Sequence, residues 1–203
     1  MKWQGRIIKI GMICSLLCVL SLSRQQYRMA VQESIANKVI RFHVLANSDS
    51  PYDQQVKKRV RDEVGAYVQP LLKESRTKEK SRQIMLTHLE DITRVANESL
   101  KKQGVSYRAY ATLCYCQFPV KSYQGVSFPA GRYEALEVVI GKGRGHNWWC
   151  VMYPNLCFSA SMKKEHDRQW RRFLQSLSPR EFEAMMQKNR WKVRFKIFDL
   201  LHK

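Results

Sequence analysis

The chain has 203 residues, and its 44% hydrophobic content supplies enough apolar material for the core of one ordinary domain. It carries 36 lysines and arginines against 17 acidic residues, a formal net charge of +19 that favours anionic surfaces or partners. This composition argues against disorder throughout. Because no helix-turn-helix, zinc-finger or RNA-binding signature is present, we expect no nucleic-acid partner.

The first 23 residues have the pattern of an export signal. A basic stretch precedes an apolar run from Ile10 to Leu22, which is short for a membrane span. Ser21 and Ser23 offer a weak cleavage site, so residues 1–23 are predicted to be a cleaved signal peptide or a retained membrane anchor. Loss of their three basic residues would leave 33 basic and 17 acidic residues, a net charge of +16. Residues 24–37 are predicted to be a linker or a short helix.

The first strand of the domain is predicted at residues 38–46, where apolar and charged side chains alternate. Arg41 and His43 fall in the charged set, so we expect them on the solvent side of the strand. A helix start follows. Ser50 is the expected N-cap residue, and Asp53 is expected to close a capping box with it.

Two amphipathic helices and three further strands follow. Apolar residues recur at helical spacing from Val56 to Leu71 and again from about Lys78 to Lys102. The period changes to two in residues 105–118, 133–140 and 148–153, and a glycine-rich loop is expected to join the last two strands as a hairpin. This order predicts an α+β fold with a mostly antiparallel sheet and two long helices on one face.

The glycine-rich stretch GKGRGH, residues 141–146, is followed by a predicted strand, so it fits neither a Walker loop nor a dinucleotide-binding fingerprint. We expect its glycines to permit positive φ in a turn, with Lys142 and Arg144 projecting from the tip. His146 and Cys150 leave open an alternative in which the protein is a secreted cysteine-dependent hydrolase.

Four cysteines lie beyond the export signal. Cys150 and Cys157 flank a Pro-Asn turn signal and are predicted to form a disulfide. Cys114 and Cys116 share one face of a strand, where a direct bridge would be strained, so buried thiols compete with cross-pairing to the other two cysteines. The spacing of all four fits zinc poorly, and we expect no metal site.

The two neighbouring tryptophans of the last predicted strand, Trp148 and Trp149, must point to opposite faces. One ring can then anchor the core while the other is exposed beside the loop tip, and the alternative is that both rings are buried. A rigid aromatic ring next to a cation is a common form of interface hot spot, so this region is the predicted contact surface.

Residues 159–203 are expected to form a basic C-terminal extension. Ser178 and Glu181 have the spacing of a capping box and predict a short helix. In residues 190–198, RWKVRFKIF, apolar and cationic side chains alternate. This pattern is typical of a charged edge strand, and it also fits a segment that lies on an anionic membrane or cell wall.

Two long segments carry a resemblance to a known family. They are IRFHVLANSDSPYDQQVKKRVRDEV at residues 40–64 and FPAGRYEALEVVIGKGRGHNWWCVMYPNLCF at residues 128–158. Together with the export signal they resemble the stage II sporulation protein R family, the exported signalling proteins of endospore-forming bacteria. The resemblance spans about residues 38–158, which we take as the signalling domain.

The resemblance implies a ligand rather than an enzyme, with no catalytic residue and no cofactor. It implies export into the space between the forespore and mother-cell membranes. There the protein would activate a membrane-embedded aspartic protease that processes a sigma-factor precursor. The residues expected to contact a partner come from the matching motifs and from the loop tip: Asn47, Asp49, Tyr133, Glu134, Lys142, Arg144, Asn147, Trp148 and Trp149.

Overall fold

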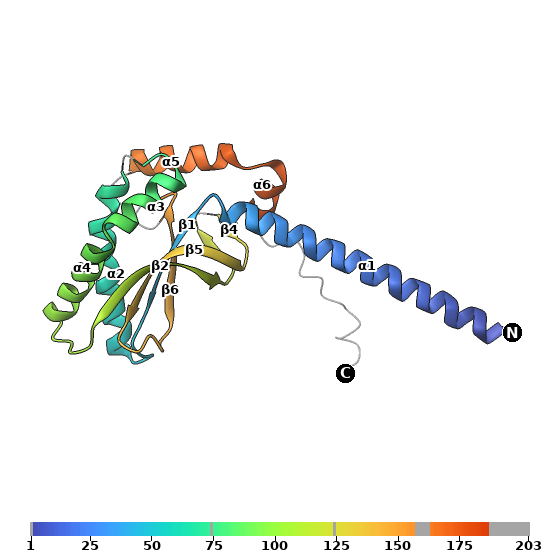
Figure 1. Ribbon diagram of the computed structural model, residues 1–203, viewed down its shortest axis with the longest axis horizontal. Helices are drawn as coiled ribbons and strands as arrows, with labels where there is room; N and C mark the ends of the chain where they lie inside the picture. Colours follow the sequence, from blue (N-terminus) through green and yellow to red (C-terminus); the bar gives the residue numbers. More distant parts are fainter. Residues whose placement is uncertain (1, 74, 124, 157–162, 187–203) are drawn as a thin grey trace, which may run out of the picture.

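The computed structural model describes residues 2–73, 75–123, 125–156 and 163–186. It confirms the expected α+β class. In chain order the elements are α1 (Lys2–Ala36), β1 (Ile40–Leu45), α2 (Pro51–Leu72), α3 (Lys78–Thr87), α4 (Leu89–Lys102), β2 (Ala109–Phe118), β3 (Lys121–Tyr123), β4 (Val126–Phe128), β5 (Gly131–Ile140), β6 (Asn147–Tyr153), α5 (Lys163–Ser176) and α6 (Pro179–Met186) (Figure 1).

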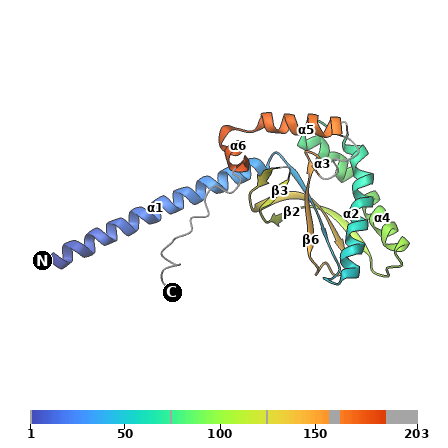
Figure 2. The ribbon, with the colours of Figure 1, turned by 180° about the vertical axis from the view of Figure 1, so that it is seen from behind.

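Helix α1 is one continuous helix that projects away from the other described elements and contacts them near its C-terminal end (Figures 1 and 2). Residues 24–37, expected to be a linker or a short helix, instead continue this helix to Ala36, and Ile35 is fully buried at its end. The apolar side chains between Ile10 and Leu22 are exposed. Among the described residues, no helix combines the length and the apolar character needed to cross a membrane.

The main sheet has four strands in the order β2-β5-β1-β6. Strand β1 pairs in parallel with β5 and antiparallel with β6, and β2 pairs antiparallel with β5. The expected hairpin between residues 133–140 and 148–153 is therefore wrong, because β1 lies between those two strands. Five of the six residues of β1 are buried, and burial on both faces suits a central strand.

One face of this sheet packs on α2 and α4 (Figure 1). The core there is aliphatic: Val56, Val60 and Val64 of α2 meet the strand residues Val44 and Leu136. The helix expected over residues 78–102 is divided into α3 and α4, because the residue between them, His88, leaves the helical conformation at φ −101° and ψ 14°.

The opposite face of the sheet is also covered, by the end of α1, the small β3-β4 sheet, α5 and α6. This second layer corrects the expectation that Arg41 and His43 face solvent, since their exposed fractions are 0% and 3%. The Arg41 guanidinium lies 4.4 Å from the Phe118 ring centroid, and its Nε donates to the Cys150 carbonyl at 3.0 Å. Burial lowers the pKa of Arg41.

The described part of residues 159–203 packs against the domain. Helix α5 was not expected, and Gln169 in it is buried and donates to the carbonyl oxygens of Leu72, the last residue of α2, and of Ser75 beyond it. Helix α6 begins with the predicted capping box, in which the Ser178 N–H donates to Glu181. The same carboxylate pairs with Lys38 at 2.7 Å. The alternating segment 190–198 lies outside the described residues.

Candidate functional site

The loops that follow β1 and β5 meet at one end of the sheet. Strands β1 and β5 run in parallel, so their carboxyl ends lie at the same edge. Residues 46–50 follow β1, and residues 141–146 follow β5 and cross the end of β1 to reach β6. We call these two segments, 46–50 and 141–146, the loop pair.

Backbone hydrogen bonds join the two halves of the loop pair. The Gly145 N–H donates to the Ala46 carbonyl at 2.9 Å, and the Arg144 N–H donates to the Asn47 carbonyl at 3.3 Å. The Asn47 side-chain oxygen accepts from the Lys142 N–H at 3.0 Å. Because each half supplies donors or acceptors to the other, the conformation of either loop depends on both.

The glycines serve two different purposes. Gly141 and Gly143 have φ of +57° and +60°, which confirms the expected use of positive φ. Gly145 has a different role, since a Cβ there would collide with the Ser48 carbonyl. Close approach of the two backbones therefore requires glycine at position 145.

Asp49 ties the two loops together a second time. Its Oδ1 lies 2.5 Å from both the backbone nitrogen and the ring Nδ1 of His146. The hydrogen bonds from the backbone and then the ring of His146 hold the pKa of Asp49 below its ordinary value. Both side chains are exposed, so this pair orients the loop tip and is open to a partner.

Asp53 anchors the loop pair to the start of α2. Ser50 caps the helix as predicted, but Asp53 does not close a capping box. Its carboxylate instead accepts hydrogen bonds from the side chains of Tyr107, Ser48 and Asn47. Burial by itself raises the pKa of Asp53, but these hydrogen bonds outweigh burial and leave the pKa below its ordinary value.

Cations gather on the loop pair. Lys142 and Arg144 are exposed, as predicted for the tip. Lys57 of α2 is buried behind them and donates to the His146 carbonyl at 2.7 Å. Burial lowers the pKa of Lys57. The loop pair is thus a braced surface that presents two basic side chains.

The two tryptophans flank this surface from opposite faces of β6, as predicted. Trp148 lies edge-on to Phe42 at 5.6 Å, under the Arg61 guanidinium. Trp149 stacks on His43 with ring centroids 5.0 Å apart. Both rings are half-buried, so the expectation that one ring is exposed beside the tip is wrong. Asn147, which precedes them, is also half-buried.

The structure buries Tyr133 and Glu134, which corrects their expected role as contact residues. Tyr133 is fully buried in the second core, and its hydroxyl donates to the Pro129 carbonyl at 2.8 Å. Glu134, on the opposite face of β5, is 4% exposed and pairs with Lys78 at 3.2 Å and Arg82 at 2.6 Å. Both faces of β5 are covered at this point, so neither side chain reaches a partner.

The geometry gives no support to a cysteine-dependent hydrolase. Cys150 is 3% exposed inside the sheet, whereas the His146 side chain is 81% exposed and bound to Asp49. A substrate that reaches His146 does not reach the Cys150 sulfur. The predicted partner of Cys150, Cys157, lies outside the described residues, so their disulfide stays a prediction.

Cys114 and Cys116 form a disulfide with Cα atoms 6.1 Å apart, where buried thiols or cross-pairing were expected. Their side chains share one face of β2, which brings the two sulfurs together. Among the described residues, the grouping with metal-ligand atoms is His43, Cys116 and Glu137, on the sheet face away from α2 and α4.

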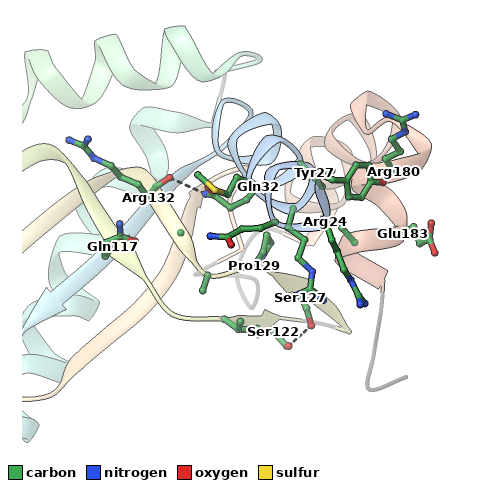
Figure 3. A pocket seen from close by; sticks show the side chains of 18 residues that line it. Arg24, Tyr27, Gln32, Gln117, Ser122, Ser127, Pro129, Arg132, Arg180 and Glu183 are labelled. Atoms are coloured by element: carbon green, nitrogen blue, oxygen red, sulfur yellow. Dashed lines mark hydrogen bonds between the residues drawn. The ribbon is translucent and has the colours of Figure 1, made fainter. Parts of the chain in front are cut away.

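A basic groove lies between α1, the β4-β5 region and α6 (Figure 3). Its volume is about 1140 Å³, and the side chain of Gln32 crosses it to donate to the Arg132 carbonyl at 3.1 Å. The Pro-Ala-Gly motif at residues 129–131 forms part of its wall, and no other pattern in the sequence pointed to this groove. Among the described residues its charged lining consists of Arg24, Arg28, Arg132, Arg180 and Glu183.

Comparisons with known proteins agree with the motifs. The family described as Stage II sporulation protein R (spore_II_R) matches residues 36–163, which is more than half of the chain. The chain is 35% identical over 140 residues to Stage II sporulation protein R of Bacillus subtilis (strain 168). That alignment covers 66% of this chain and 62% of the relative. No solved structure matches the chain.

Proposed function

Because this chain belongs to the stage II sporulation protein R family, we propose that it is an exported signalling protein of sporulation. In this proposal it activates a membrane-embedded aspartic protease of the mother cell and so triggers processing of a sigma-factor precursor. It acts as a ligand, by binding the extracytoplasmic part of the protease and favouring its active state.

The loop pair is the observation that supports this proposal best. Its residues come from the two segments that resemble the family, and they are joined by hydrogen bonds before any partner arrives. A surface that is already ordered loses little conformational entropy on binding. The exposed Lys142 and Arg144 supply charge for an acidic surface on the protease, and Asn47 and Asp49 hold them in place.

The N-terminal helix supports the proposed location. Its apolar side chains from Ile10 to Leu22 remain exposed in the fold, so the domain itself does not use them. We propose that this segment directs export into the space between the two membranes, as a cleaved signal or as an anchor. The mass of the exported protein distinguishes the two, because a cleaved protein lacks the N-terminal segment and an anchored protein keeps it.

The test co-expresses the chain with the protease and the sigma-factor precursor and follows precursor processing by immunoblot. The double variant Lys142→Glu/Arg144→Glu changes exposed side chains at the loop tip. We expect processing to fall at least tenfold, because the two glutamates would face the acidic surface of the protease, and like charges brought together at an interface cost several kcal/mol. Trp149→Ala is less specific, since it also removes the stacking on His43.

The matched control is Lys73→Glu/Lys80→Glu. Both lysines are exposed at the far end of α2 and the start of α3, and the change in net charge is the same. We expect near-normal processing from this control. Normal processing with the loop-tip variant would show that the loop pair does not contact the protease. Equal loss with both variants would replace a specific contact by a general charge effect.

The basic groove favours a second candidate function, which is contact with an anionic membrane or wall polymer. Four arginines line it, two from α1 and one each from β5 and α6. The double variant Arg24→Gln/Arg28→Gln should then weaken sedimentation with vesicles that contain an anionic lipid, and added salt should weaken it further. Unchanged sedimentation would leave the protease as the proposed partner.

A further inference from the structure

One row of side chains crosses the sheet on the face away from α2 and α4. In the strand register, Glu137 of β5 lies beside Thr112 of β2 and His43 of β1, and His43 lies beside Trp149 of β6. Residues two apart on a strand share a face, so Cys114 and Cys116 join Thr112 on this side. Two sulfurs, an imidazole and a carboxylate are therefore brought together from three strands.

His43 is the most unusual member of this row. It is 3% exposed, and neither of its ring nitrogens has a hydrogen-bond partner among the described residues. Its Nε2 lies 3.1 Å from a Glu137 oxygen, in an orientation that does not make a hydrogen bond. The ring therefore has one nitrogen without any partner and one that faces Glu137 outside hydrogen-bond geometry, and a cation between that second nitrogen and the carboxylate would satisfy both groups.

The separations among these groups suit a small tetrahedral cation. The Glu137 oxygens lie 3.8 Å from the Cys114 sulfur and 3.9 Å from the Cys116 sulfur. Ligand atoms of His43, Cys116 and Glu137 all lie within 4.8 Å of one another. In a tetrahedral zinc site, bond lengths of about 2.0–2.3 Å place neighbouring ligand atoms roughly 3.3–3.8 Å apart. Cys114 lies outside this group of three, but its sulfur is bonded to Cys116 and close to Glu137, so its side chain would have to rotate after reduction to reach the same centre.

We propose that His43, Glu137, Cys114 and Cys116 form a site for a thiophilic divalent cation such as Zn²⁺ when the two cysteines are reduced. A thiol or phosphine reductant supplies two electrons and two protons to break the Cys114–Cys116 bond. The cation then displaces the two thiol protons and binds both thiolates, the imidazole and the carboxylate. When an oxidant such as molecular oxygen or a small-molecule disulfide takes up two electrons from the thiolates, the Cys114–Cys116 bond re-forms, two of the four ligands are lost and the cation is released.

Three of the four proposed ligands are partly exposed in the described part of the chain. Cys114, Cys116 and Glu137 are half-buried rather than enclosed, whereas His43 lies beneath them. A bound cation would fix the His43 ring against Trp149, on which it stacks. The site is separate from the loop pair, so it would act on the stability of the sheet rather than on the partner contact.

The test uses the full chain with Cys14→Ser and Cys18→Ser, which remove the two exposed thiols of α1. The reduced protein is titrated with Co²⁺ in the absence of oxygen, and then with Zn²⁺. We expect one Co²⁺ per chain, a thiolate-to-cobalt charge-transfer band, and displacement of Co²⁺ by Zn²⁺. The oxidised protein should show no such band.

Three variants assign the ligands. We expect Glu137→Gln, Cys116→Ser and His43→Gln each to weaken binding at least tenfold, whereas His88→Gln, at the α3-α4 junction, should bind as the parent does. Circular dichroism checks that each variant folds, and if His43→Gln does not fold, the other two carry the test. The proposal fails if the reduced chain binds no Co²⁺, if the oxidised chain binds equally well, or if Glu137→Gln and Cys116→Ser leave affinity unchanged.

Discussion

The two faces of the central sheet differ in what they bury. The face toward α2 and α4 is filled mainly with aliphatic side chains such as Val60 and Leu136, and the carboxylate buried there, Glu134, is paired with two basic side chains of α3. The other face buries Arg41 among aromatic rings and His43 beside Glu137. The first face can contribute stability without specific geometry, whereas the second depends on exact partners for its polar groups. The first face therefore contributes mainly to stability, whereas the second holds the buried groups that could bind a ligand.

The largest expected effect is on the aliphatic face. Leu136→Ala removes a fully buried side chain at the centre of the sheet. We expect the free energy of unfolding to fall by about 3 kcal/mol, because a cavity remains where the side chain was. Urea denaturation measures the change. The control is Tyr110→Ala on β2, whose ring is 54% exposed, and we expect it to cost well under half as much. An equal cost would show that burial on the face toward α2 and α4 is not the source of the stability.

The next effect concerns the layer that closes the second face. Glu181 of α6 binds Lys38 and Ser34. Burial raises its pKa, but the hydrogen bonds from Lys38, Ser34 and Ser178 outweigh burial and lower the pKa to about 2. Because the folded pKa lies below the unfolded one, the stabilisation is present above pH 4.5 and is lost as the pH falls toward 2.

Glu181→Gln should therefore lower the free energy of unfolding at pH 7 by on the order of 3 kcal/mol, and parent and variant should converge near pH 2. Urea denaturation across this pH range measures the difference. A difference that stays constant with pH would show that the ionised carboxylate of Glu181 is not its source.

A smaller effect on the free energy of unfolding is expected in the loop pair, at the carboxyl ends of β1 and β5. Gly145→Ala places a methyl group against the Ser48 carbonyl, so the loops must separate. We expect a loss of about 1–3 kcal/mol in unfolding free energy, together with reduced precursor processing. Gly11→Ala is the control, because no atom lies within 4 Å of its added Cβ. Equal behaviour of the two variants would mean that the loops do not need to stay in contact.

The smallest effect is local to the loop tip. The pKa of Asp49 is held below its ordinary value by the backbone and ring hydrogen bonds of His146. Carboxyl NMR should show Asp49 titrating below the ordinary range of an aspartate, and His146→Gln should move that titration partly back upward. Global stability should not change measurably, because Asp49 is exposed. If the titration of Asp49 is unchanged in the variant, the His146 ring does not influence the pKa of Asp49.

Local patterns in the sequence predict the elements well. The alternation in β1 and the capping residues Ser50 and Ser178 place one strand and two helix starts correctly, because such signals depend on neighbours only a few residues away. The positive charges of Lys142 and Arg144 are also exposed as predicted. These features determine which segments are helices or strands and which side chains reach solvent at a turn.

The tertiary structure alone decides which of these elements meet. Insertion of β1 between β5 and β6 turns an expected hairpin into a crossover, and that crossover brings Asp49 to His146. A second layer over the sheet turns the alternating positions Arg41 and His43 from surface into core. The period of a strand shows that two sets of side chains face opposite ways, but long-range packing decides whether either set meets water.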